Sequence, residues 1–497
     1  MNALEEIIGS LNTIDKQLFV RYLKSKSTRD THLNVQLLEL LETDDISAVK
    51  KFKERYSADA FHAHRKRLYD SVVDFLAMRT FENDISQEHE ILKLLVVSRR
   101  FLEQQLNKAA FKCLAKAEVI AEAMEHYSLL NEIYHTQVQY AHLGSVASFD
   151  ALIQKYNDNR QKLEKEEKLN VAYALLRKEL GEIYHKGKIT NLRQLIEDTI
   201  SSLGISLEDV ITFKSLYQML YIANEYASIN SDFRAVDAFA VNSYAFLSGR
   251  QDLAEKHLFY HIQILYFMAN LHFRNRRYDE ANADLTKMQE QMQKQGGRYQ
   301  PRFVFRHALL AALTANYSGN PQGAITIVEK TLKTAKKATA PDVNDLRLSL
   351  IVVHLQLDDG KQAYVQLREL SRTDSWYEKT MGMDWAIKKN LVELLAHITM
   401  EHTELALSRI KSFRRRYKKY LEAVSETRVL MYLQLLERYA TDLDVISDPA
   451  FRENVERLIA NADTGGADIF VISFLGWLLA RIQKKLPYEV ILAMAGS

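Results

Sequence analysis

The chain is poor in the residues that staple or interrupt regular structure: its 497 residues include one cysteine, five prolines and 16 glycines. The single cysteine, Cys113, excludes an internal disulfide and suits a reducing compartment. The scarcity of glycine and proline, against abundant Leu, Ala, Glu, Lys and Arg, is typical of a helical protein. Valine and isoleucine recur at helical rather than alternating spacing. The composition therefore predicts an all-α fold.

The chain also lacks an excess of charge of either sign, and it has no long apolar run. Its 66 Lys and Arg residues nearly balance its 64 Asp and Glu residues, which favours neither nucleic acid nor an anionic membrane as a partner. The longest largely apolar run, residues 469–480, is too short to span a bilayer. The acidic start MNALEEIIGS lacks the basic and apolar regions of a signal peptide. We expect a soluble, cytoplasmic protein that does not contact a membrane.

Motifs that carry catalytic chemistry are missing as well. The sequence has no phosphate-binding loop, dinucleotide fingerprint, nucleophile elbow or paired-cysteine site. His257 and His261 are spaced four apart, but no third ligand accompanies them in a known zinc pattern. Carboxylates are numerous but scattered, so no acid–base pair can be selected. We expect no catalytic residues, no cofactor and no metal, and hence a protein that is not an enzyme.

One local pattern returns eight times, at steps of 39 to 46 residues. In this pattern an aromatic residue or histidine precedes an alanine by nine residues; we name these positions the ring column and the alanine column. Each column breaks once, at different units, and the exceptions stand in parentheses below. The ring column reads Phe101, His142, Tyr184, Tyr226, His272, (Ala315), His354, His397, and the alanine column reads Ala110, Ala151, (Arg193), Ala235, Ala281, Ala324, Ala363, Ala406. Steps of this size are typical of helix–turn–helix repeats, so they predict an α-solenoid, an architecture that usually binds other molecules. Histidine, phenylalanine and tyrosine share the ring column, which predicts packing rather than chemistry there.

The clearest unit contains Ala269, His272, Tyr278 and Ala281. A small residue, a ring three later, a turn, a tyrosine and an alanine nine after the ring resemble the tetratricopeptide repeat. The match is divergent, because the units have about 42 residues instead of 34 and lack the consensus tryptophan. The resemblance implies a right-handed α-solenoid of helical hairpins with helical caps at both ends.

Two regions fall outside the repeat register, which covers residues 86–425 in about eight units. Residues 1–85 are expected to form a helical cap, with helices over residues 14–23, 33–41 and 57–78; the alternative is a separate DNA-binding module. Residues 426–497 are expected to form capping helices. Within them the apolar helix over 469–482 closes the core or, alternatively, docks another chain.

The resemblance also implies which residues face a ligand, because the first helix of each tetratricopeptide unit lines the concave groove. The register places Asn224 and Asn270 at equivalent positions in neighbouring units, where each amide can bond to a peptide backbone. The same face carries the remaining groove candidates, Tyr266, Arg274, Arg306 and Asn316. Together these side chains suit an extended peptide with an acidic group; the alternative is an incidental polar face.

A basic segment, KSFRRRYKKY over residues 411–420, interleaves cations with three aromatic residues. One hypothesis is an anion or nucleic-acid contact through its cations. The other is an amphipathic second helix whose basic side is solvated. The candidate contact residues are Arg414, Arg415, Arg416, Lys418 and Lys419.

The sequence thus predicts a non-enzymatic scaffold that binds a protein or peptide in a concave groove. The alternative is a tetratricopeptide-containing regulator or sensor whose N-terminal helical region contacts DNA or a signalling partner. A nucleic-acid partner is not favoured. The sequence leaves the identity of the partner and the oligomeric state open.

Overall fold

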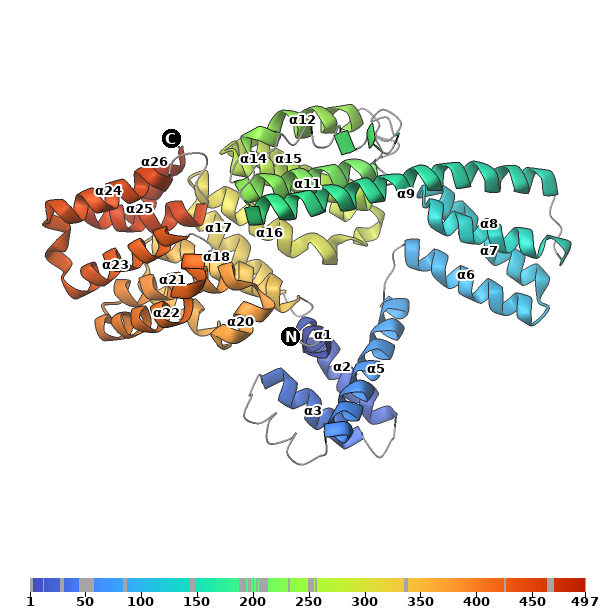
Figure 1. The fold of residues 1–497 in the computed structure, drawn as a ribbon, viewed down its shortest axis with the longest axis horizontal. Coiled ribbons are helices and arrows are strands. Elements are labelled where there is room, and N and C mark those ends of the chain that lie inside the picture. Colours follow the sequence, from blue (N-terminus) through green and yellow to red (C-terminus); the bar gives the residue numbers. More distant parts are fainter. Residues whose placement is uncertain are drawn as a thin grey trace. The chain divides into compact units, whose positions relative to one another are not determined.

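The computed structural model describes most of the chain. The exceptions are residues 1–2, 12, 27–30, 44–57, 84–86, 144–147, 187–193, 195–197, 200, 203, 205–212, 231–232, 249–253, 255–256, 335–337, 424–425, 463–468 and 497. The described residues form 23 α-helices and two short 3₁₀ turns, with no strand among them (Figure 1). This confirms the all-α prediction. None of the described helices has both the length and the apolar character needed to cross a bilayer.

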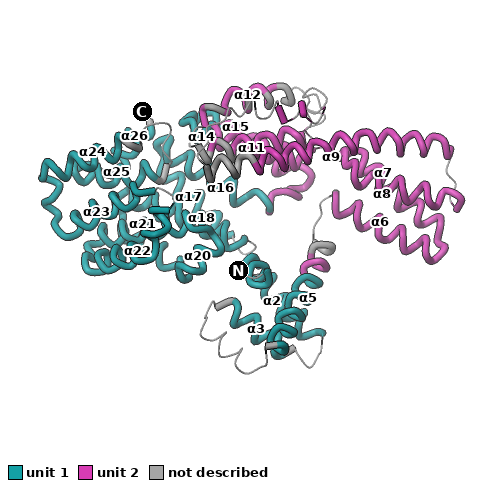
Figure 2. Tube along the Cα trace, in the orientation of Figure 1, with its two compact units in different colours: residues 1–75, 272–282, 302–497 teal, residues 76–271, 283–301 magenta. Residues whose placement is uncertain are grey.

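The chain divides into two compact units (Figure 2). Unit 1 contains residues 1–75, 272–282 and 302–497, and unit 2 contains residues 76–271 and 283–301.

Four helices form the described N-terminal region: α1 (Ala3–Ser10), α2 (Thr13–Ser25), α3 (Thr31–Thr43) and α5 (Ala58–Asn83). Helices α2, α3 and α5 overlap the three expected helices, and α1 was not expected. Phe19 of α2 and Phe75 of α5 are buried, with ring centroids 5.2 Å apart. Arg65 of α5 forms an ion pair with Glu5 of α1 at 3.1 Å. These contacts tie the helices into a small bundle.

In unit 2, helices that follow one another along the chain pack on one another. Its helices are α6 (Gln87–Glu103), α7 (Asn107–Ala123), α8 (Tyr127–Gln139), α9 (Phe149–Lys186), α11 (Phe213–Asn230) and α12 (Arg234–Ser248), with a 3₁₀ turn η1 (Ala141–Leu143) before α9. The helices α14 (Leu258–Arg274) and α15 (Tyr278–Gly297) contribute to both units. One end of α9 packs on α8, and α11 lies along its other end (Figure 1).

The long helix α9 departs from the repeat prediction. It has 38 residues and contains both Ala151 and Tyr184, so no turn separates the second helix of one unit from the first helix of the next. Ala151 is exposed, whereas the alanine column predicts a buried contact. Tyr184, Arg193, Tyr226 and Ala235 cannot be compared, because their side chains lie outside the described set.

The remaining helices of unit 1 continue the pattern of adjacent pairs. They are α16 (Gln300–Tyr317), α17 (Pro321–Lys333), α18 (Ala340–Gln356), α19 (Gly360–Arg368), α20 (Asp374–Thr380), α21 (Met383–Thr399), α22 (Thr403–Ala423), α23 (Thr427–Thr441), α24 (Pro449–Ala462), α25 (Ile469–Gln483) and α26 (Pro487–Gly496), with a 3₁₀ turn η3 (Leu443–Ser447) before α24. Contacts join α18 to α19, α21 to α22 and α22 to α23, as expected for stacked helical hairpins.

The two columns mark the turns of five hairpins. At His272 the carbonyl accepts a hydrogen bond from the amide of Arg277, five residues later, at 2.8 Å. Arg276 between them has a positive φ of 62°, which completes a Schellman C-cap. The carbonyl of Arg277 then accepts from the amide of Ala281 at 3.0 Å, the first bond of the next helix. The spacing of nine is therefore one C-cap plus one helical turn.

The same backbone arrangement recurs in four other hairpins, one of which starts at Ala315, where the ring column is broken. It starts at Phe101, Ala315, His354 and His397, and the corresponding left-handed residues are Gln105, Gly319, Asp358 and Glu401. The alanines that begin the second helices are completely buried: Ala110, Ala281, Ala324, Ala363 and Ala406. A side chain larger than alanine would separate the two helices at these close crossings.

The apolar helix α25 closes a core within unit 1. Trp477 and Leu478 are buried together with residues of α21, α23 and α24 in one hydrophobic cluster. The side chains of Ile472, Phe474, Leu475, Trp477 and Leu478 are buried within this chain, as expected for a helix that packs in the C-terminal core. The docking alternative depends on exposed apolar side chains, and these five described side chains are not exposed.

Candidate ligand-binding faces

Asn224 and Asn270, which the repeat register places at equivalent positions of neighbouring units, contact each other in unit 2. The Nδ2 of Asn270 on α14 donates to the Oδ1 of Asn224 on α11 at 2.9 Å. Both side chains are half-buried. The bond leaves the amide of Asn224 as a donor and the carbonyl of Asn270 as an acceptor, which is the pair of groups that an extended peptide backbone satisfies.

Aromatic side chains continue this face along α11 and α14. Tyr217 and Tyr221 lie one turn apart on α11, on the side of Asn224. Phe267 on α14 lies 5.9 Å from the ring of Tyr217 and 6.1 Å from that of Tyr221, and Tyr260 lies 5.7 Å from Tyr217. All four rings are half-buried, so each is held by its neighbours and still reaches solvent.

The long helix α9 borders the same face. Asn170 accepts a hydrogen bond from Gln218 at 3.4 Å, and the guanidinium of Arg177 lies 4.4 Å from the ring centroid of Tyr221. Lys214 forms an ion pair with Glu166. Because Glu166 neutralises Lys214, Arg177 is the only unneutralised cation among these residues, and its side chain is exposed. We name the whole set the amide–ring face: Asn170, Arg177, Tyr217, Gln218, Tyr221, Asn224, Tyr260, Phe267 and Asn270.

The amide–ring face rests on a packed core. Leu216 and Leu220 of α11 are buried against Ile264 and Met268 of α14 in one hydrophobic cluster. These contacts fix the two helices that carry the rings and amides. A rigid support of this kind preserves the geometry of a binding face before a ligand arrives.

The six predicted groove residues do not all belong to this face. Tyr266 is half-buried on α14, with its ring 6.0 Å from that of Phe267. Arg274, Arg306 and Asn316 belong to unit 1, whereas Asn224, Tyr266 and Asn270 belong to unit 2. Arg306 is exposed on α16, and Arg274 is half-buried.

The expectation that Asn316 faces a ligand is wrong. Its side chain is 1% exposed and donates to the Oε1 of Gln356 at 2.8 Å. Gln356 in turn donates to Tyr317 and to Ser473 of α25, each at 3.1 Å. The hydroxyl of Tyr488 on α26 donates to the backbone carbonyl of Asn316 at 2.6 Å. The C-terminal helices of the same chain therefore occupy this end of α16 and α18.

The basic segment forms an amphipathic helix. Phe413 and Tyr417 of α22 are buried in the core of unit 1. Arg416 makes a bidentate ion pair with Glu378 at 2.5 and 2.9 Å, and this hydrogen bonding raises the pKa of Arg416 above its usual value. The apolar side of the helix thus points inward, as the amphipathic interpretation requires.

Carboxylates neutralise much of the predicted anion contact. Arg414 lies 2.5 Å from Glu437, and Lys418 lies 3.7 Å from Glu422. Arg415 and Lys419 are exposed and make no ion pair with a described residue. Only two of the five candidate cations therefore remain available to bind an anion. This favours the interpretation of a solvated basic side over that of an anion-binding site.

The histidine pair considered as a metal ligand packs around one aromatic ring. The rings of His257 and His261 lie 5.9 and 5.6 Å from that of Phe213. Burial, together with the charges of Lys294 and Lys287, lowers the pKa of His261 to about 4. In the part of the chain that the structure describes, no group of three or more His, Cys, Asp or Glu residues is arranged to hold a metal ion.

A buried ionic cluster on α21 escaped the sequence reasoning. Lys389 and Glu393 are 6% and 5% exposed and lie 2.8 Å apart, and Lys389 also contacts Asp374 at 3.2 Å. Arg409 of α22 lies 2.8 Å from Glu393. Burial alone would raise the pKa of Glu393, but His397, Lys389 and Arg409 together hold it at about 2. The visible signal was a Lys and a Glu four apart within an apolar helix.

Comparison with protein-family models finds no match, and a search of curated proteins finds no significant similarity.

Proposed function

We propose that the protein is a non-enzymatic scaffold that binds an extended segment of a protein partner on the amide–ring face. The bond between Asn224 and Asn270 supports the proposal most directly, because it links α11 to α14 and leaves one amide donor and one carbonyl acceptor for a ligand. Peptide backbones present the complementary groups at regular intervals.

The rings beside the amides supply apolar contact area. Tyr217, Tyr221, Tyr260 and Phe267 are already ordered by their mutual contacts, so little side-chain entropy is lost on binding. Arg177 adds a positive charge at the edge of the face, which favours a partner segment with an acidic residue. The resulting chemistry is that of peptide recognition.

The repeat architecture supports the same function. The alanine and ring columns, and the Schellman turns that they mark, resemble a tetratricopeptide-like solenoid. Arrays of stacked hairpins present extended surfaces that recognise other chains. We assign no catalytic residue, cofactor or metal to this protein.

The experiment begins with affinity purification and identification of the partner chains. Peptides tiled from a recovered partner are then titrated against the full-length protein by fluorescence anisotropy. The double variant Asn224→Ala/Asn270→Ala is expected to weaken the best peptide by at least about tenfold, roughly the effect of losing one or two hydrogen bonds.

The control variant is Asn242→Ala, which removes an exposed asparagine from α12 of the same unit. It should leave peptide affinity and the partner set unchanged. Equal affinity of the double variant and this control for every peptide would remove the amide–ring face from the mechanism.

A further inference from the structure

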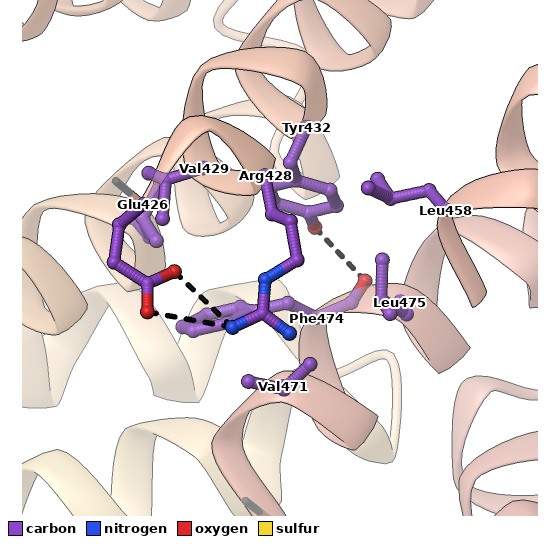
Figure 3. A pocket seen from close by; sticks show the side chains of 9 residues that line it. Glu426, Arg428, Val429, Tyr432, Leu458, Val471, Phe474 and Leu475 are labelled. Carbon is purple, nitrogen blue, oxygen red and sulfur yellow. Dashed lines mark hydrogen bonds and ion pairs between the residues drawn. The ribbon is translucent and has the colours of Figure 1, made fainter. Parts of the chain in front are cut away.

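A pocket of about 80 Å³ lies in the C-terminal part of unit 1 (Figure 3). Residues of α21, α23, α24 and α25 line it, together with Glu426 just before α23. Its uncharged wall consists of Leu391, Val429, Tyr432, Leu458, Val471, Phe474 and Leu475. The hydroxyl of Tyr432 donates to the backbone carbonyl of Phe474 at 2.9 Å, so the wall offers no free hydroxyl to a ligand. The wall is chemically apolar.

The two charged residues of the lining are Glu426 and Arg428. The Nη2 of Arg428 lies 3.3 and 3.4 Å from the two carboxylate oxygens of Glu426. Figure 3 shows the Arg428 side chain among the lining residues, with its guanidinium directed toward the carboxylate of Glu426. The side chains of Arg428 and Glu426 are 50% and 45% exposed, so this ion pair stands between the apolar wall and solvent.

An ion pair with this exposure is held weakly. Exposed pairs contribute little to stability, because water solvates both groups nearly as well when they separate. A ligand can therefore insert its own charges between Glu426 and Arg428 at small cost. A ligand that carried only one charge would leave the other member of the pair without its partner.

The volume limits the size of the apolar part of such a ligand. An engineered protein cavity of about 150 Å³ accommodates benzene, which has six carbons. By proportion, a pocket of about 80 Å³ suits a branched aliphatic group of three or four carbons.

We infer that this pocket binds a small aliphatic zwitterion, namely a free α-amino acid with a side chain like that of valine or leucine. The aliphatic group lies among Leu391, Leu458 and Leu475. The carboxylate pairs with the guanidinium of Arg428, and the ammonium pairs with the carboxylate of Glu426. The carboxylate of Glu426 and the guanidinium of Arg428 lie side by side, as do the ammonium and carboxylate groups attached to the α-carbon of an amino acid. This site is separate from the amide–ring face and does not depend on the proposed function.

The test is calorimetric titration of the full-length protein with L-leucine. A ligand of this size is expected to bind with a dissociation constant in the micromolar to millimolar range. Isoamylamine is leucine without its carboxylate, and 4-methylpentanoate is leucine without its ammonium. Each should bind at least about tenfold more weakly than leucine, because one protein charge remains unpaired. Glycine, which has no aliphatic group, should give no measurable binding.

Substitutions of the exposed residues Arg428 and Glu426 separate the roles of the two protein charges without disturbing the core. Arg428→Gln should weaken leucine by at least about tenfold, while isoamylamine binds equally well or better, because no guanidinium is then left without its partner. Glu426→Gln should weaken leucine similarly, while 4-methylpentanoate binds equally well or better. The matched control is Arg438→Gln on the same helix, which breaks an exposed ion pair with Asp448 and should leave all affinities unchanged.

Three results would overturn the inference. The first is the absence of saturable heat with millimolar leucine. The second is equal affinity for leucine and 4-methylpentanoate, which would indicate a simple carboxylate site. The third is leucine binding that survives both charge substitutions unchanged, because the zwitterion would then have no role for its charges.

Discussion

Asn270 and Asn224 orient each other: the amide nitrogen of the first donates to the amide oxygen of the second at 2.9 Å across two helices. Each residue therefore determines which polar atoms the other presents to solvent.

This pairing predicts non-additive effects on stability. Asn224→Ala and Asn270→Ala should each lower the free energy of unfolding by about 1 kcal/mol, and the double variant should cost little more than either single variant. Urea denaturation of the four proteins forms the double-mutant cycle. Strict additivity would show that the hydrogen bond contributes nothing.

The left-handed turn residues offer a route to stabilisation. Glu401 has a φ of 58° at the end of α21, a conformation that costs an L-residue roughly 1–2 kcal/mol. Glu401→Gly should therefore raise the free energy of unfolding by about 0.5–1 kcal/mol after the entropy of glycine is subtracted. Lys411→Gly, at an exposed position inside α22, should lower it by about 1 kcal/mol. Thermal unfolding of both variants checks the opposite signs.

The alanine column predicts a contrast between two alanines. Ala406 is fully buried at the crossing of α21 and α22, so Ala406→Leu should destabilise the protein by about 1–3 kcal/mol through overpacking. Ala151 is exposed on α9, and Ala151→Leu should change stability by no more than about 0.5 kcal/mol. Chemical denaturation distinguishes the two. Equal losses would mean that the column does not report close packing.

The buried ionic cluster predicts a dependence of stability on pH. The pKa of Glu393 is about 2 in the folded protein, below its ordinary value of 4.5, so its ionised form is stabilised by folding. That contribution, on the order of 3 kcal/mol, is complete above pH 4.5 and is lost as pH falls toward 2. Glu393→Gln should flatten this part of the profile in denaturation measured between pH 5 and 3.

The partner of Glu393 should also matter at neutral pH. Lys389→Met removes the cation that contacts both Glu393 and Asp374, leaving two carboxylates with less compensation. We expect a loss of about 3 kcal/mol, typical of breaking a buried pair on one side. The double variant Lys389→Met/Glu393→Leu should recover part of that loss, and a larger loss would contradict this account.

Local sequence determined much of the fold. The turns at His272, His354 and His397 could be located because a C-cap followed by one helical turn has a fixed length along the chain. The column register wrongly places a turn between Ala151 and Tyr184, whereas local propensity agrees with the single helix α9. Residues 149–186 contain no proline and a single glycine, which favours one uninterrupted helix.

A site residue could be predicted from the sequence only where the residues that contact it occupy equivalent positions in the neighbouring repeat unit. Asn224 and Asn270 occupy equivalent positions of successive units, so periodicity brought them together. The prediction that Asn316 faces a ligand was wrong because its surroundings include Ser473 and Tyr488, which lie more than 150 residues later in the chain. A repeat pattern does not encode contacts over that distance. The aromatic members of the amide–ring face could not be identified from the repeat, because they belong to neither column.

The hydrogen bond between Tyr317 and Ser473 spans 156 residues of chain at 2.7 Å. An open stack of repeats can grow or shrink by whole units at its end, since each unit touches only its neighbours. Here α25 and α26 pack against the ends of the earlier helices α16 and α18. Duplication of a hairpin between these elements would therefore break the contacts between them. During synthesis, Asn316, Tyr317 and Gln356 remain uncovered until Ser473 and Tyr488 have been made.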